Sequence, residues 1–248
     1  VGSEMCIRDS FYSRHIGLAN GQLVPIQGGG RVTGRLGGFE LGMLNIQTGD
    51  VGWELRRNLG TTQLPDQAPS EITSTNFGVF RVKRDLWRRS HLGALYTRRS
   101  NVPGRQSAGE TYGIDSQLGF GNDFTSHAYW ARTQVAGITA SNNTSYRAQI
   151  DYNADRYGVQ AEHLVVEKGF NPELGFLRRN DLRKNYVFGR FSPRPQAGSF
   201  IRRYSFSGSF NHIANNETGI LETRRAEGDF RIEFLNGDFA LFGMTDRY

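Results

Sequence analysis

Apolar and polar side chains alternate with a period of two along much of the chain. The alternation is clearest over residues 146–153, 157–165, 204–211 and 229–234. In the last of these segments, Phe230, Ile232 and Phe234 are separated by charged residues. Successive side chains of a β-strand point to opposite faces, so each segment has one apolar and one polar face. No segment joins a capping residue to a sustained apolar period of 3.6, which would predict a helix. The pattern predicts an all-β protein.

Weaker strand patterns fill most of the remaining chain, and turn-forming residues separate many of them. The weaker patterns lie near residues 11–18, 30–36, 38–47, 73–84, 90–99, 111–121, 124–135, 185–192, 217–225 and 238–246. Turn signals include Gly37–Gly38, Asn101–Gly104, Gly121–Asp123, Asn142–Asn143, Asn153–Asp155 and Asn236–Asp238. We expect roughly 13 or 14 antiparallel strands in up-and-down order, many of about 9–11 residues, against a mean of 5–6 in soluble proteins.

Long antiparallel strands with two unlike faces can close into a transmembrane barrel or stack into a soluble sandwich. Transmembrane barrel strands have about 9–11 residues, with apolar side chains toward lipid and polar ones toward the lumen. Aromatic residues concentrate near the expected strand ends, where membrane barrels carry aromatic girdles. They include Tyr112, Phe120, Tyr146, Tyr152, Tyr157, Tyr204 and Phe210. The pattern favours the transmembrane barrel, and a soluble sandwich with a wet outer face is the alternative, because it gives the same alternation.

Composition excludes several other classes of protein. With 37% hydrophobic residues and a mean hydropathy of −0.53, the 248 residues do not form a helical membrane protein. A single Cys excludes a disulfide framework and cysteine-based zinc sites. The net charge is +6, but the basic residues are scattered, so nucleic-acid binding is not expected. Arginine pairs fall mostly at strand ends, where they would meet either anionic headgroups or water.

The two ends of the chain differ from the rest. Val1–Ser10 holds the only Cys and shows no strand period, so we expect a non-native leader there. Residues 11–248 are expected to form one partial β-barrel domain, because the strand-like pattern runs to Tyr248. We therefore interpret the sequence as an internal fragment of a longer protein.

Six motifs in this order along the chain resemble a bacterial protein family. They are Phe11–Gly17, Gly30–Gly38 with the following Gly42–Asn45, Phe77–Asp85, Tyr152–Gly158, Phe170–Asp181 and Arg190–Pro195. Together they resemble the domain-of-unknown-function family 5916, over nearly the whole chain from residue 11. The resemblance implies an outer-membrane-type β-barrel domain, which in this family often follows a carbohydrate-binding module similar to family 9.

The resemblance also carries expectations about function. It implies a location in the bacterial outer membrane, lipid as a partner, and binding or uptake of glycans or related polymers together with the exported module, with carbohydrate as a second partner. That module is absent from this chain, so its label is not transferred to any residue here. No catalytic residues, cofactors or oligomeric state follow from the resemblance.

Motifs for catalysis are scarce. The sequence has no Gly-x-Ser-x-Gly elbow and no paired histidines at metal-binding spacing, and Gly28–Gly34 lacks the Lys of a phosphate loop. We therefore predict no catalytic residues, no metal and no cofactor. Four acidic residues on expected polar faces keep a glycosidic-bond hydrolase as an alternative. They are Asp151, Glu162, Asp229 and Glu233. The competing interpretation is that these carboxylates pair with Arg147, Arg156 and Arg231 to stabilise a barrel interior.

The connection Phe170–Asp181 is the strongest candidate for a special segment. Asn171–Pro172 marks a turn, and the segment is rich in charged and amide side chains. We select Asn171, Arg178, Arg179 and Asp181 as candidate binding residues. Either the connection folds into or over the lumen and binds substrate, or it is an ordered turn fixed by charged hydrogen bonds.

Overall fold

The computed structural model describes residues 16–19, 22–50, 73–102, 107–137, 141–175, 177, 179–196 and 199–248. These residues form two short strands, β1 (Leu18–Ala19) and β2 (Gln22–Leu23), and twelve long ones. The long strands are β3 (Ile26–Leu36), β4 (Phe39–Thr48), β5 (Asn76–Trp87), β6 (Ser90–Arg99), β7 (Gly109–Phe120), β8 (Phe124–Val135), β9 (Thr144–Asn153), β10 (Tyr157–Val166), β11 (Leu182–Phe191), β12 (Ile201–Asn215), β13 (Leu221–Phe234) and β14 (Phe239–Arg247).

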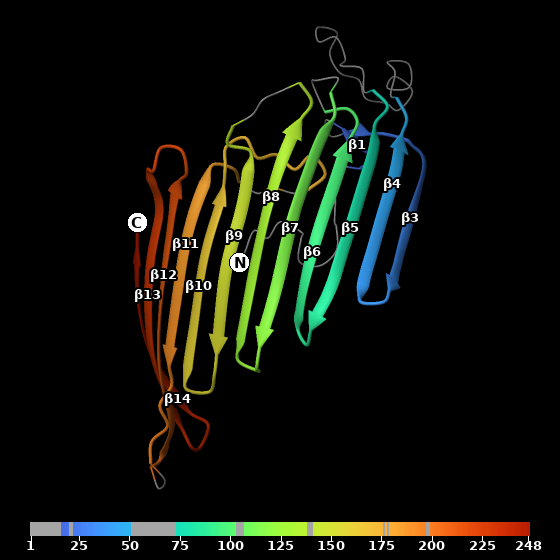
Figure 1. Cartoon of the computed structure of the whole chain (residues 1–248). Coiled ribbons are helices and arrows are strands. Elements are labelled where there is room, and N and C mark those ends of the chain that lie inside the picture. The colour runs from blue at the N-terminus through green and yellow to red at the C-terminus, as the bar shows by residue number, and fades with distance from the viewer. Residues whose placement is uncertain are drawn as a thin grey trace.

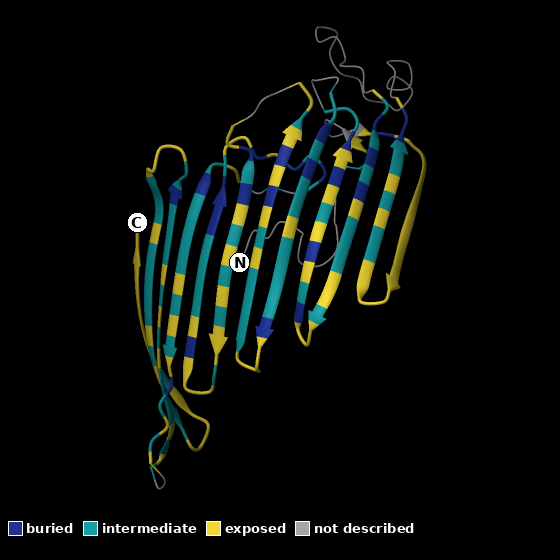
Figure 2. Cartoon of the chain, viewed as in Figure 1, coloured by how far each residue is buried: buried dark blue, intermediate teal, exposed yellow. Residues whose placement is uncertain are grey.

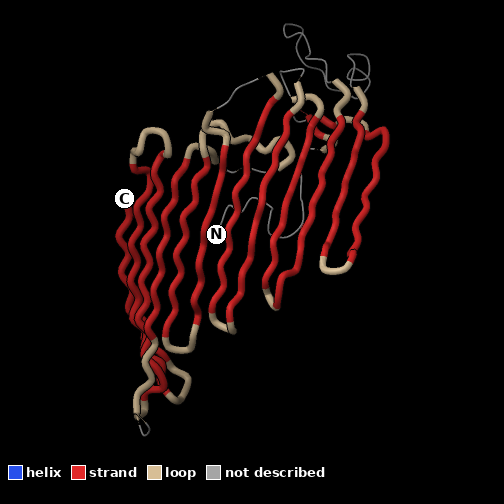
Figure 3. Tube along the Cα trace, viewed as in Figure 1, coloured by secondary structure: helices blue, strands red, loops and turns tan. Residues whose placement is uncertain are grey.

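The twelve long strands form one antiparallel sheet in which each strand pairs with its neighbours in the sequence (Figure 1). The predicted all-β, up-and-down architecture is thus confirmed, and Figure 3 shows strands and connections alone in the described part of the chain. No helix among the described residues is long and apolar enough to span a membrane. Within the same residues neither β3 nor β14 has a partner strand on its outer side.

One expected strand boundary was wrong. The expected strands 217–225 and 229–234 belong to one strand, β13, which begins at Leu221 and continues without a break to Phe234. The alternation persists because Ala226 and Gly228 continue the apolar side of the strand, opposite Phe210 and Gly208 of β12. Residues 1–10, the expected leader, and most of the expected strand 11–18 lie outside the described residues.

The register gives the sheet two unlike faces. On β9, Tyr146, Ile150 and Tyr152 share one face, while Arg147 and Asp151 share the other. Tyr152 lies opposite Phe124 of β8 and Val159 of β10, so aromatic and aliphatic residues align from strand to strand. We call the two sides the apolar face and the polar face. Figure 2 shows the resulting alternation of exposure along the strands.

The two ends of the sheet carry different connections (Figure 1). At one end the turns are short, as at Gly37–Gly38, Arg88–Arg89 and Gly121–Asp123, and only the connection between β11 and β12 is longer. At the other end lie the long connections 49–75 and 167–181. We call them the turn end and the loop end. Gly37 and Gly121, both with φ of 59°, take the left-handed conformation that tight turns require.

The strands are staggered as in a tilted barrel wall. A row of paired residues that begins at Phe39, the first residue of β4, reaches Arg224 on β13 after nine strand-to-strand steps. The turn end of β13 is Phe234, ten residues beyond Arg224. With about 3.3 Å per residue and about 4.8 Å between strands, this stagger corresponds to a tilt of about 38° when the turns are level. Barrel strands tilt by about 35–45°.

Candidate functional site

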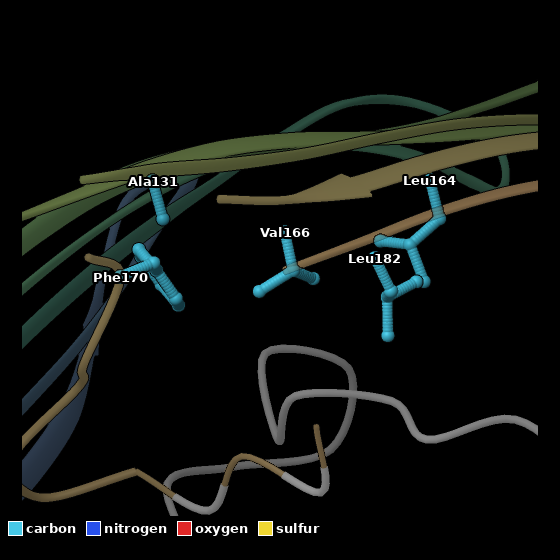
Figure 4. Close-up of a cluster of buried hydrophobic side chains, with 5 residues drawn as sticks. All are labelled: Ala131, Leu164, Val166, Phe170 and Leu182. Atoms are coloured by element: carbon cyan, nitrogen blue, oxygen red, sulfur yellow. The ribbon is translucent and has the colours of Figure 1, made fainter. Parts of the chain in front are cut away.

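The long connection between β10 and β11 crosses the polar face near the loop end. We call residues 167–181 the crossing segment. Phe170, 1% exposed, packs against Ala131 of β8 together with Val166, Leu164 and Leu182 (Figure 4). The amide of Gly169 donates to the carbonyl of Asn142, 2.8 Å away, in the connection between β8 and β9. The segment thus turns back over strands that precede it in the sequence.

Leu174 carries the crossing segment further, to the strands β4–β6. Its side chain is fully buried against Phe77 and Val79 of β5. Leu44, Ile46 and Leu95 pack around the same cluster, and all of them lie on the polar face. The two apolar clusters under the segment therefore replace the polar surface found elsewhere on this face.

A largely buried ion pair flanks Leu174. Glu173 Oε2 lies 3.5 Å from Arg99 Nη1, and the two side chains are 9% and 10% exposed. Arg99 also donates from Nε to the carbonyl of Asn101, 2.8 Å away, and lies over the ring of Phe77 at 5.4 Å. Gly109 leaves room for the pair, because a Cβ there would lie 2.8 Å from Cγ of Glu173. Such a pair holds the crossing segment on β6, because moving Glu173 away from Arg99 would leave a buried charge without its partner, which is costly.

The predicted binding residues are anchored to separate parts of the sheet. The backbone amide of Asn171 donates a hydrogen bond to Oγ1 of Thr133 on β8, 3.2 Å away. Arg179 forms an ion pair with Glu222 of β13. Asp181 accepts from Asn215 Nδ2 at 2.9 Å and from the amide of Glu217 at 3.1 Å.

Asn171 is thus held at β8, whereas Arg179 and Asp181 are held at the β12–β13 hairpin, so the three residues do not gather into one site. Arg178 lies outside the described residues. Glu217, whose amide donates to Asp181, also accepts a hydrogen bond from Nζ of Lys168 at 2.8 Å, and this hydrogen bond raises the pKa of Lys168. Whether the segment binds a ligand stays a prediction.

The rest of the polar face carries charges of both signs in contact. Arg81 of β5 forms a bidentate pair with Asp115 of β7, with Nη2 2.8 Å from Oδ2. The pair passes over Gly93 of β6, and His91 Nε2 lies 3.9 Å from the same carboxylate. Since two strands contribute to the pair across a third, it fixes the spacing of β5, β6 and β7.

Gly93→Ala is expected to lower the free energy of unfolding by about 1–3 kcal/mol, the usual cost of overpacking. The added Cβ would lie 2.5 Å from Nη2 of Arg81 and 2.7 Å from Oδ1 of Asp115, so the ion pair would have to separate. Gly189→Ala on β11 is the matched control, because nothing lies within 4 Å of its Cβ position. Denaturant unfolding of both variants measures the difference, and equal stabilities would contradict the argument.

Two of the four candidate catalytic carboxylates are ion-paired. Glu162 lies between Arg147 Nη2 at 3.2 Å and Lys184 Nζ at 3.1 Å. Glu233 contacts Arg203 Nη2 at 3.0 Å and Arg202 at 3.7 Å.

The other two carboxylates form no ion pair among the described residues. Asp151 accepts a hydrogen bond of 2.7 Å from Gln149, and Asp229 is exposed. Of the three arginines expected as partners, Arg147 pairs as predicted, whereas Arg231 lies over the ring of Phe239 at 4.2 Å. Arg156 contributes its backbone carbonyl, which accepts from the amide of Ser192. Glu162 and Glu233 are thus neutralised by cationic side chains, and Arg147 is the one of the three expected arginines that pairs with a candidate carboxylate among the described residues.

A polar cavity of about 500 Å³ lies at the turn end of the polar face. Asn153, Ala154, Asp155, Arg190, Ser192, Arg203 and Ser205 line it. The Arg190 guanidinium is used by the fold, because it donates to Asn153 Oδ1 at 2.9 Å and to the carbonyl of Ala154 at 2.7 Å. The cavity can therefore admit small polar solutes but offers no free guanidinium from Arg190. In the described part of the chain, no three His, Cys, Asp or Glu side chains are grouped to hold a metal ion.

Sequence reasoning missed the residues that place the crossing segment. Phe170 and Leu174 are apolar residues in a connection rich in charged and amide side chains, and this was the available signal. The apolar partners of Leu174 and the ion-pair partner of Glu173 lie more than 70 positions earlier in the chain, so no local pattern identifies them. Comparison of the chain with known proteins returned no matching family, no curated relative and no similar solved structure.

Proposed function

We propose that this chain forms the wall of a β-barrel embedded in the bacterial outer membrane, with the apolar face toward lipid and the polar face toward a solute-accessible interior. One observation carries the proposal: large apolar side chains are exposed on one face of the sheet, from β3 to β14. They include Val32, Met43, Phe80, Leu92, Ile114, Trp130, Ile150, Val159, Val187, Phe210 and Phe242. A continuous apolar surface of this extent is rare on a soluble monomer.

The aromatic residues on this face support the same proposal. Phe39, Trp87 and Tyr157 lie at the turn end of their strands, as do Phe120 and Phe191. Aromatic rings at strand ends are typical of the girdles of membrane barrels. From Tyr157 a ladder of neighbouring rings crosses to β14 through Phe191, Phe206, Phe230 and Phe242.

Dimensions and connections fit a bilayer as well. A ten-residue strand tilted by about 38° rises about 26 Å, close to the apolar band of about 25 Å in outer-membrane barrels. Short turns at one end and long connections at the other are typical of these proteins. In lipid every backbone group must be paired, so the proposal requires the outer edges of β3 and β14 to be paired after insertion.

The polar face supports a role as conduit or binding platform. Ion pairs such as Arg81–Asp115 and Arg147–Glu162 give it a charged but internally balanced surface, and the crossing segment narrows the space over β4–β10. We assign it the binding or uptake of polar polymers. That these are glycans, handled together with an exported carbohydrate-binding module, rests on the family resemblance alone and stays a prediction.

The two alternatives have less support. A glycosidic-bond hydrolase needs an acid and a base at a defined separation, but Glu162 and Glu233 are held by cationic side chains. A soluble sandwich needs a second sheet over the aromatic face, and the described residues place none there. The barrel wall therefore accounts for more of the geometry.

Insertion into a bilayer tests the proposal directly. Refolded into phosphatidylcholine vesicles, the chain is expected to stay with the vesicles in alkaline carbonate and to migrate differently on a denaturing gel before and after boiling. Both results are expected because the strands would be buried in lipid with their backbone groups paired. Extraction by carbonate together with unchanged migration would end the membrane proposal.

A further inference from the structure

Several arginines on the apolar face lie near the loop end. Arg98 on β6, Arg132 on β8 and Arg183 on β11 share this face with Tyr96, Trp130 and Val187, because each lies an even number of positions away from one of them. Arg98 and Arg132 are exposed, and Arg183 is half-buried. Arginine is costly on a lipid-facing surface except near an interface, so the height of these side chains decides what they meet.

The three arginines lie at one height above the turn end. Each is eight residues from the turn-end residue of its strand, which is Ser90 for β6, Phe124 for β8 and Phe191 for β11. At a tilt of about 38°, eight residues rise about 21 Å. The turn-end aromatic residues mark the other border of the apolar band, which is about 25 Å tall in membrane barrels. The long arginine side chains can therefore reach the headgroup layer at the loop end.

The hydrogen-bonding capacity of these guanidinium groups is only partly used. Arg132 donates from Nε to Asn143 Oδ1 at 3.1 Å, and Arg98 lies 3.7 Å from Glu110. No hydrogen bond or ion pair of Arg183 is present among the described residues, and its register neighbours are Val165 and Ala214. Guanidinium is the side-chain group best suited to bind phosphate oxygens in pairs.

We infer that Arg98, Arg132 and Arg183 form a collar that binds the phosphate groups of anionic lipids in the leaflet at the loop end. The inference rests on the proposed membrane function. At the turn end, Arg89 donates to the carbonyls of Gly121 and Asn122, and Arg84 lies over the ring of Phe39, so these two guanidinium groups are engaged within the fold. The collar therefore gives the inserted protein a preferred lipid environment at the loop end.

Two tryptophans, one beside the collar and one at the turn end, provide the test. Trp130 lies two residues from Arg132 on the apolar face, and Trp87 lies at the turn end of β5. Single-tryptophan chains that retain Trp130 (W53F/W87F) or Trp87 (W53F/W130F) are refolded into phosphatidylcholine vesicles. One set of vesicles contains a minority of brominated phosphatidylcholine and the other the same fraction of brominated phosphatidylglycerol, because bromine quenches tryptophan fluorescence on contact.

Trp130 is expected to be quenched more strongly by brominated phosphatidylglycerol than by brominated phosphatidylcholine, with a relative binding constant about fivefold higher. The quenching of Trp87, which lies at the turn end beside the exposed Arg88, is expected to be unchanged by R132Q/R183Q. R132Q/R183Q should remove the preference at Trp130, whereas the control R84Q should retain it, and added salt should weaken it.

The outcomes separate the collar from the membrane proposal. Equal quenching of Trp130 by the two brominated lipids overturns the collar but leaves the protein in the membrane. Absence of quenching of both tryptophans by either lipid overturns the membrane proposal itself. A preference that persists in R132Q/R183Q assigns anionic-lipid binding to other residues and also overturns the collar.

Discussion

Val187→Arg is expected to lower the free energy of unfolding in lipid vesicles by about 2–4 kcal/mol, the cost of an arginine near the middle of the bilayer on a barrel's lipid-facing surface. Val187 is 52% exposed on the apolar face of β11. It lies four residues from Phe191, the turn end of its strand, which places it about 10 Å into the apolar band. Denaturant unfolding in phosphatidylcholine vesicles, followed by tryptophan fluorescence, measures the change.

The matched control lies at the same height on the opposite face. Ser209 of β12 pairs with Phe188, the residue after Val187, and its side chain lies 3.4 Å from Glu227. Ser209→Arg therefore places the same charge beside a carboxylate on the polar face, and little change is expected. If the apolar face met water instead of lipid, Val187→Arg would also stay within about 0.5 kcal/mol, as exposed substitutions usually do. Equal stabilities of the two variants would thus contradict a lipid-facing surface.

The two faces of the sheet could be predicted because they depend on local chemistry. Period-two alternation, as at Tyr146, Ile150 and Tyr152, fixes which side chains share a face once the strands pair in order. Tight turns such as Asn236–Gly237 then set the register of neighbouring strands. No turn signal separates the expected strands 217–225 and 229–234, and the alternation continues between them through Gly228. The break expected there was wrong, because β13 runs through it.

The path of the crossing segment could not be predicted, because it depends on contacts between residues far apart in the sequence. Phe170 and Leu174 find their partners across the sheet, and contacts of that range leave no periodic trace in the sequence. The candidate residues Arg179 and Asp181 were selected for charge, and their charge is used to hold the segment to β13 and the β12–β13 turn. The charges of Arg179 and Asp181 therefore indicate that the connection is ordered by contacts with the sheet, and they are not by themselves a sign of ligand binding.

Leu174→Ala is expected to release the crossing segment from β4–β6. The side chain is fully buried against Phe77 and Val79, so its truncation leaves a cavity and costs about 2–5 kcal/mol. Because only the segment is held by this contact, the loss should appear as local opening rather than as unfolding of the sheet. Trypsin cleavage after Lys168 or Arg179, and hydrogen exchange of the amides between them, should both become faster.

Leu174→Met is the control, since this volume-conserving change usually costs less than about 1.5 kcal/mol. It should keep the segment docked and the ion pair between Glu173 and Arg99 intact. If the crossing segment narrows the interior, Leu174→Ala should also raise the passage of small polar solutes into vesicles that contain the protein, while Leu174→Met should not. Unchanged cleavage and exchange in Leu174→Ala would show that the apolar contact of Leu174 is not needed to hold the segment, and that its other contacts are sufficient.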